Sequence, residues 1–183
     1  SLTDDPSRTA TYEAINIARN SGAVISYDPN YRAALWSDPE TAQLRMQSLI
    51  PYVDMMKISD EETSLLTPYQ DPEEAIQYLL RQGVHLVAVT LGRDGALIGN
   101  ENGIIKAEGF SSHAVDTTGA GDSFWGGFLA SYLQEETSPE HLTRAQMIQF
   151  GRVGNAVASL CVERRGGISA IPEMEEIEER LRG

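Results

Sequence analysis

Residues 115–124 read Val-Asp-Thr-Thr-Gly-Ala-Gly-Asp-Ser-Phe, and this stretch carries most of the information in the 183-residue chain. Gly119 and Gly121 stand directly before a segment with helical character, where glycine lets the backbone approach a ligand without a Cβ in the way. The first N–H groups of a helix have no partners inside it and point outward at the positive end of the helix dipole. The stretch therefore predicts an anion site suited to a phosphate, or to the charge that develops during phosphoryl transfer.

Asp122 follows in the predicted first turn of that helix and puts a carboxylate beside the anion site. A carboxylate disfavours the simple binding of phosphate, but it can orient or deprotonate a hydroxyl that attacks phosphorus. A tight turn at Gly119 and Gly121, with Asp122 as a helix cap, is equally compatible with these residues alone. A dinucleotide fingerprint would need a third glycine where Phe124 stands, and a P-loop would need Gly-Lys followed by Ser or Thr, which occurs nowhere in the sequence.

The segments around this stretch predict strands that alternate with helices. Strands are expected over residues 23–27, 54–58 and 85–90, and a hairpin over residues 96–98 and 104–106. Helices are expected over 6–20, from 38 toward 50, from 71 to 83, after 121, from 138 to about 163, and over 173–181. Such alternation predicts βαβ units, and therefore one α/β domain over residues 1–183 with a mostly parallel sheet and helices on both faces.

Composition and charge exclude several classes of protein. The chain has 14 Lys+Arg against 27 Asp+Glu, a net charge of −13, which argues against nucleic acid or an anionic membrane as a partner. The single cysteine, Cys161, excludes an internal disulfide and a Cys-rich zinc site. Apolar runs are too short to span a bilayer and the first residues lack a signal pattern, so the sequence favours a cytoplasmic location.

Residues 116–124 resemble the C-terminal signature of the ribokinase-like (PfkB) carbohydrate kinases, and other stretches agree with that family in order and spacing. They are residues 25–32 (Ile-Ser-Tyr-Asp-Pro-Asn-Tyr-Arg) with Leu-Trp at 35–36, 57–62 (Lys-Ile-Ser-Asp-Glu-Glu), 89–96 (Val-Thr-Leu-Gly-Arg-Asp-Gly-Ala) and 166–172 (Gly-Gly-Ile-Ser-Ala-Ile-Pro). The resemblance implies a three-layer ribokinase-like fold and an ATP-dependent sugar kinase. Because residues 1–2 already match a mid-chain position, we expect a C-terminal fragment that lacks the N-terminal strands and lid and is inactive alone.

The resemblance also implies roles for individual residues. Asp122 would be the general base toward the sugar hydroxyl, and the backbone amides of Gly119, Ala120 and Gly121 would form the anion hole. Glu62 would help to organise Mg²⁺ through water, since Mg²⁺ keeps much of its hydration shell. From the residues alone, Glu62 could also be an acid in the first turn of a helix, favoured by the dipole.

The same resemblance supplies the rest of the site. The further ATP-binding residues that it implies are Ser59, Thr90, Gly92, Gly95 and Asn155. Asn30 and Arg32 would approach the sugar or a phosphate, although Arg32 is also compatible with an ordinary surface cation. Thr90 and Gly92 are likewise compatible with a strand end and the turn that follows it. A monovalent cation such as K⁺ would lie among Asp116, Thr118, Cys161, Arg164 and Gly166. Ala170 stands where some relatives have a cation-binding Ser, and Ser59 where many have Asn.

Agreement at residues 28–32, 35–36, 59–62 and 122–125 favours a fructokinase, which converts MgATP and a ketose into ADP and a sugar phosphate. 2-Keto-3-deoxygluconate kinase and other PfkB sugar kinases are the alternatives within the enzyme class. An alternative of another class is a non-catalytic nucleotide-binding module or remnant, which would bind MgATP without turnover. The expected partners are a sugar and ATP, and a homodimer is one assembly open to the full-length enzyme.

Overall fold

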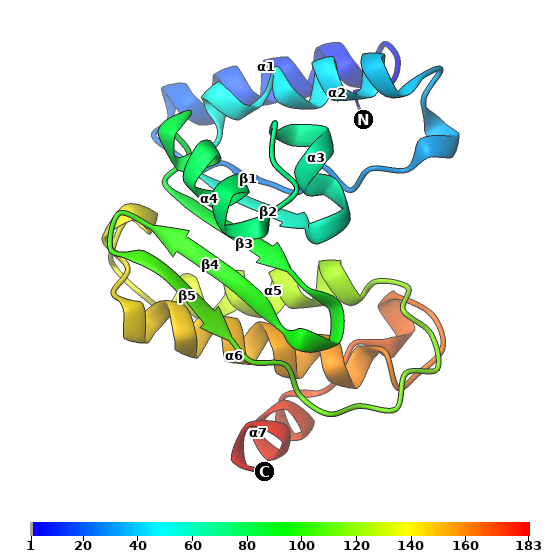
Figure 1. Cartoon of the computed structure of the whole chain (residues 1–183), viewed down its shortest axis with the longest axis vertical. Helices are drawn as coiled ribbons and strands as arrows, with labels where there is room; N and C mark the ends of the chain where they lie inside the picture. Colours follow the sequence, from blue (N-terminus) through cyan, green and yellow to red (C-terminus); the bar gives the residue numbers. More distant parts are fainter. Residues whose placement is uncertain (1) are drawn as a thin grey trace.

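The strands of the described part of the chain, residues 2–183 of this computed structural model, form one five-stranded sheet in the order β1-β2-β3-β4-β5 (Figure 1). They are β1 (Ser26–Tyr27), β2 (Met55–Ser59), β3 (Leu86–Thr90), β4 (Ala96–Asn100) and β5 (Gly103–Ala107). The pairs β1–β2 and β2–β3 are parallel, whereas β3–β4 and β4–β5 are antiparallel. The sheet is therefore mixed, because the hairpin predicted over residues 96–106 joins it beside β3.

Helices cover both faces of the sheet, as the sequence predicts for a three-layer α/β fold. Within residues 2–183 they are α1 (Ser7–Asn20), α2 (Pro39–Gln47), α3 (Thr63–Leu66), α4 (Pro72–Arg81), α5 (Ala120–Tyr132), α6 (Arg144–Cys161) and α7 (Met174–Arg182). Helices α1, α2 and α4 pack on one face, and α5 and α6 lie side by side on the other (Figure 1). Helix α7 packs outside α6.

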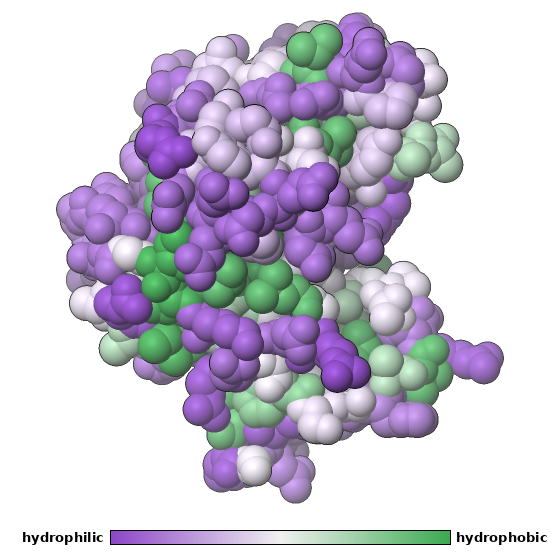
Figure 2. All heavy atoms as spheres, viewed as in Figure 1, coloured by the Kyte–Doolittle hydropathy of each residue, from purple (hydrophilic) through white to green (hydrophobic). Residues whose placement is uncertain are grey.

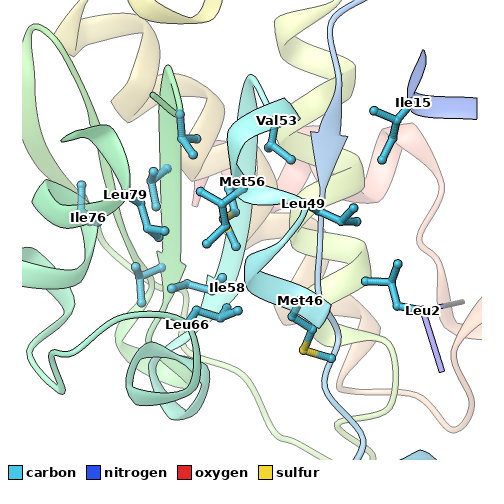
Figure 3. Packing of buried hydrophobic residues seen from close by; sticks show 14 residues of the cluster. Leu2, Ile15, Met46, Leu49, Val53, Met56, Ile58, Leu66, Ile76 and Leu79 are labelled. Carbon is cyan, nitrogen blue, oxygen red and sulfur yellow. The ribbon is translucent and has the colours of Figure 1, made fainter. Parts of the chain in front are cut away.

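The two hydrophobic layers take alternate residues of the central strands. Met56 and Val87 join the cluster beneath α1, α2 and α4, which Figure 3 shows at close range. Met55 and Leu86, their neighbours in sequence, join the cluster that contains residues of α5 and α6. All four are fully buried. Burial on both faces explains why residues 85–90 form a nearly continuous apolar run, as is usual for the central strands of a covered sheet.

Two helices begin where the sequence predicts, at an aspartate followed by proline. The Asp38 carboxylate accepts the N–H of Thr41 at 2.7 Å, and the Asp71 carboxylate accepts the N–H of Glu74 at 2.9 Å. Each aspartate thus satisfies one of the N–H groups that the first helical turn leaves without a partner.

The predicted helix start at residues 138–139 is wrong. Residues Pro139–His141 form a single 3-10 turn, and α6 begins only after Thr143. Thr143 and Gln146 form a reciprocal capping box, in which each side chain bonds the backbone N–H of the other. Leu142 lies between the two elements with non-helical backbone angles and a fully buried side chain. The buried, non-helical Leu142 separates the 3-10 turn from α6, and the capping box at Thr143 and Gln146 marks where α6 begins.

The predicted strand over residues 23–27 pairs only at its last two residues. The N–H of Ile25 donates to the Asp54 carboxylate at 2.7 Å rather than to a neighbouring strand. This contact ends the ladder before Ser26, so β1 is a short strand at the edge of the sheet.

The start of α5 is held at a fixed place over the sheet. The Trp125 indole N–H donates to the Ser26 hydroxyl of β1 at 2.8 Å. On the opposite side of the helix, a Cβ on Gly127 would stand 3.1 Å from the Cα of Gly154 in α6, so the two helices approach closely where neither has a side chain. These contacts position the glycine-rich turn that precedes α5.

Figure 2 shows that the face seen in Figure 1 is mostly hydrophilic, with apolar residues gathered where β4 and β5 lie. The same view shows the molecule hollowed on its right-hand side, toward which β2 and β3 point. Within residues 2–183, every helix is too short or too polar to cross a lipid bilayer.

Candidate active site

A cavity of about 800 Å³ opens at the carboxyl ends of β2 and β3, beside the start of α5. It is lined by residues 30–32, 57, 59–62, 90, 92 and 117–122. The carboxyl ends of parallel strands are the usual place for a ligand in an α/β sheet. The cavity therefore brings together the four segments 30–32, 59–62, 90–92 and 119–122, which the sequence assigns to the site.

The glycine-rich turn leaves backbone donors open toward this cavity. Gly119 has φ +80°, and a Cβ there would meet the Cα of Gly167 at 3.1 Å, so the turn requires glycine. The N–H of Ala120 donates to the Thr117 carbonyl at 3.2 Å, which engages one amide of the predicted anion hole. Within residues 2–183, no backbone carbonyl accepts the N–H of Gly121 or Asp122. These two amides, at the positive end of α5, are free to bind an anion.

Asp122 lies in the first turn of α5 with an exposed side chain that lines the cavity. Its carboxylate therefore stands beside the open amides, the arrangement that the sequence predicts. This combination can stabilise charge on a phosphoryl group and accept a proton from the group that attacks it.

Glu62 binds the protein at both of its carboxylate oxygens. It is 8% exposed; Oε1 accepts the N–H of Tyr31 at 2.7 Å, and Oε2 accepts the N–H and the hydroxyl of Ser59 at 2.8 and 3.0 Å. Glu62 thus ties the end of β2 to the loop at residues 30–32. Oε1 accepts a single hydrogen bond and the residue lines the cavity, so it fits a hydrated Mg²⁺ that contacts the protein through water.

Replacing Glu62 with Gln should raise the Mg²⁺ requirement and lower the melting temperature together. The amide nitrogen would face an N–H donor, and an unsatisfied buried donor costs about 1–3 kcal/mol. That is roughly 2–4 °C of melting temperature per kcal/mol for a domain of about 150–250 residues, and less for a longer chain. Mg²⁺ titrations of activity and thermal melts on the complete gene product measure both effects. Glu73→Gln, at an exposed acid in the first turn of α4, is the matched control. A lower melting temperature with unchanged Mg²⁺ dependence would leave Glu62 only its structural role.

The nucleotide residues predicted from the motifs divide into two groups. Thr90 ends β3 and lines the cavity together with Gly92. Gly95 and Asn155 lie outside the cavity lining. A Cβ on Gly95 would stand 2.1 Å from the Ala107 carbonyl oxygen, and the Asn155 amide donates to that same carbonyl at 2.9 Å. Asn155 therefore binds the end of β5, and Gly95 lets the turn after β3 approach it closely.

The residues predicted to surround a monovalent cation lie close together but bind one another. The Asp116 carboxylate accepts the N–H groups of Gly166 and Thr118, each at 2.9 Å, and these bonds lower the pKa of Asp116 to about 2. The Cys161 thiol donates to the Thr118 carbonyl at 3.8 Å, and the Cys161 carbonyl accepts the N–H of Arg164. The Arg164 side chain pairs with Glu176 of α7. Each Asp116 oxygen accepts only one of these bonds and keeps capacity for a further ligand, so a monovalent cation among these residues stays a prediction.

Asn30 and Arg32 lie on a loop with a constrained backbone. Asn30 has φ +46°, and its N–H donates to the Asp28 carboxylate at 3.0 Å. Arg32 is exposed and lines the cavity, where its guanidinium contacts only the neighbouring Tyr31 carbonyl, at 3.5 Å, among the described residues. Arg32 is therefore available to an anionic ligand.

Lys57 is a cavity residue whose role the sequence motifs do not indicate. It lies on β2, is 6% exposed, and its ammonium contacts Asp28 Oδ2 at 3.0 Å. One signal was present in the sequence, since Lys57 is one of only two lysines and interrupts an apolar strand.

Solved structures define the class of fold as that of the sugar and riboside kinases. Fructokinase from Vibrio cholerae O395, with fructose, ADP and calcium ion bound, aligns with a TM-score of 0.90 and 32% identity over 98% of this chain and 57% of that one. Aminoimidazole riboside kinase from Salmonella enterica, bound to its riboside and an ATP analog, aligns with a TM-score of 0.87 and 26% identity over 100% of this chain and 60% of that one. These alignments confirm the predicted ribokinase-like fold.

The model of the pfkB family carbohydrate kinases matches residues 1–174, and the chain belongs to that family. Probable fructokinase-4 of Arabidopsis thaliana is 35% identical over 185 residues, which cover 100% of this chain and 56% of that protein. Fructokinase of Vibrio alginolyticus is 32% identical over 97% of this chain and 57% of its own length. The resemblance seen in the motifs is confirmed, and the chain spans little more than half the length of these relatives.

Proposed function

We propose that this chain is the nucleotide- and phosphate-binding part of a kinase that transfers the γ-phosphate of ATP to a sugar hydroxyl, with fructose as the favoured sugar. The observation that carries the proposal is the start of α5, where the free amides of Gly121 and Asp122 and the Asp122 carboxylate face one cavity. The names of the fructokinase relatives, and the fructose and ADP bound by the Vibrio cholerae enzyme, support the choice of sugar and nucleotide.

The geometry supports an in-line transfer. The Asp122 carboxylate would take the proton of the sugar hydroxyl as the hydroxyl oxygen forms its bond to the γ-phosphorus. At the same time the bond from that phosphorus to the β–γ bridging oxygen would break, and ADP would leave. The amides of Gly121 and Asp122 would stabilise charge on the transferred phosphoryl oxygens, and Arg32 would bind a phosphate from the neighbouring loop. Mg²⁺, when bound with ATP, would neutralise phosphate charge near Glu62.

A substrate panel tests this proposal. We expect the complete gene product to release ADP fastest with fructose, compared with ribose, 2-keto-3-deoxygluconate and nucleosides at equal concentrations. The 183-residue chain alone should bind MgATP in a calorimetric titration without turnover, since β1 leaves an unpaired edge and the relatives are nearly twice as long.

The outcomes of the panel separate the alternatives. Fastest release with another sugar would reassign the substrate and keep the kinase. MgATP binding by the complete gene product without ADP release on any acceptor would replace the kinase with a nucleotide-binding module.

A further inference from the structure

The Lys57 ammonium is buried at a place where the fold gains little from a positive charge. A Cβ on Gly121 would stand 2.6 Å from Lys57 Nζ, so the ammonium lies directly behind the second residue of α5. The positive end of the helix dipole repels a cation, and removing an ammonium from water carries a further cost. Packing alone therefore does not explain why a lysine occupies this position.

The single carboxylate partner of Lys57 leaves part of its binding capacity unused. An ammonium has three donors, and within residues 2–183 its one hydrogen-bonding acceptor is Asp28, at 3.0 Å. Asp28 is itself largely removed from water; that burial raises its pKa, and Lys57 acts in the opposite direction. Lys57 also lines the cavity that contains the free amides of the α5 turn. Positive charge thus remains available on the cavity side of the pair.

The pair also connects two segments of the cavity wall. Asp28 binds the Lys57 ammonium through Oδ2 and the N–H of Asn30 through Oδ1. Asn30 has φ +46°, and two residues farther on, Arg32 faces the cavity. One carboxylate therefore holds both the buried cation and the bend that presents Arg32.

We propose that Lys57 is a positioning residue of the phosphoryl-transfer site, which adds positive charge behind the free amides at the start of α5 and, through Asp28, fixes the loop that carries Arg32. The inference rests on the proposed kinase function. It agrees with glycine as the second residue of α5, since a side chain there would displace the Lys57 ammonium from behind the amides. It also predicts that the charge of Lys57 matters more for the transition state than for ground-state binding.

Paired variants separate this role from a merely structural one. Lys57→Gln and Asp28→Asn each leave one buried charge unpaired, so both should lower the melting temperature. The double variant D28N/K57Q removes both charges and places two amides that can bond each other, and its melting temperature should recover toward wild type. Its kcat should stay about 10²–10³-fold low, the size of the loss on removing one oxyanion donor, with little change in KM for the sugar.

A binding measurement gives a second readout that needs no turnover. ADP with aluminium fluoride mimics the transferring phosphoryl group, and D28N/K57Q should bind it more weakly than wild type while binding ADP alone equally well. Lys106→Met, at the other lysine, is the control; it is 44% exposed, pairs with Glu108, and should change neither value. If D28N/K57Q does not fold, D28N/K57M tests the same loss of the Lys57 charge with an apolar side chain at residue 57.

Three results decide the matter. Recovery of both melting temperature and kcat in the double variant would overturn the inference and leave Lys57 as the partner of Asp28 only. Recovery of melting temperature without kcat, together with weaker binding of ADP and aluminium fluoride, would support it. A wild-type protein that phosphorylates no acceptor would refute the proposed function itself, which is a different outcome.

Discussion

Asp122→Asn is expected to lower kcat by about 10²–10⁴-fold, the usual contribution of a general base, which corresponds to roughly 3–5 kcal/mol of barrier. ATP affinity and melting temperature should barely change. Asp122 is exposed in the first turn of α5, and its side chain makes no hydrogen bond or ion pair with the other described residues. Asparagine keeps its shape, so the substitution removes a proton acceptor and little else.

The helix-cap interpretation of Asp122 predicts the opposite pattern, namely a modest loss of stability with near-normal turnover. Measuring kcat, ATP affinity and melting temperature on the same variant of the complete gene product distinguishes the two. Near-normal kcat would end the assignment of Asp122 as the base. A fall in kcat that tracks a fall in folded protein would point to the cap.

Local sequence signals correctly predicted where a helix begins in places where a single residue determines that start. The Asp-Pro starts at residues 38 and 71 need only an aspartate side chain and the next turn of backbone, and both are seen. The prediction of where α6 begins was wrong because two local helix-start signals lie within a few residues of each other. Ser138 with Pro139 resembles a helix start, but Leu142 is drawn into the core and the helix begins after Thr143. That burial depends on distant elements, so the sequence alone could not rank the two signals.

The candidate site shows the same division. The motifs assign Glu62, Thr90 and Asp122 to one site, and all three line one cavity, because strand ends and a helix start converge at one edge of the sheet. The role of Lys57 could not be predicted from spacing, since it depends on contact with Gly121 and Asp28 across 64 and 29 residues of sequence. Whether the Lys57 ammonium is buried depends on how the helices pack on the sheet, which the sequence alone does not show.

Gly95 lies in a sequence motif, and the structure requires glycine there for more reasons than the motif indicates. Its φ of +93° and ψ of −130° belong to a region that only glycine adopts readily. A Cβ there would also stand 2.1 Å from the Ala107 carbonyl oxygen and 2.6 Å from the Gly109 nitrogen, and both are backbone atoms that cannot turn aside. Two independent penalties thus meet at one residue.

We expect Gly95→Ala to cost about 2–6 kcal/mol of folding free energy, from about 1–3 for the backbone conformation and about 1–3 for the overpacking. At roughly 2–4 °C per kcal/mol, the fall in melting temperature is easily measured. Gly92→Ala is the matched control in the same turn, because φ is +57° there and nothing lies within 4 Å of the added Cβ. That variant should lose only about 1–2 kcal/mol.

The two glycines should also differ in how they affect ATP. Gly92 lines the cavity and Gly95 does not, so Gly92→Ala should raise KM for ATP while Gly95→Ala acts on the amount of folded protein. Thermal melts and ATP saturation curves on both variants measure this. If Gly95→Ala melted no lower than Gly92→Ala but weakened ATP binding more, Gly95 would bind the nucleotide directly, as the motif alone suggests. The contact with the Ala107 carbonyl favours the other result, because a side chain at residue 95 must separate the turn from the end of β5 before it can affect any ligand.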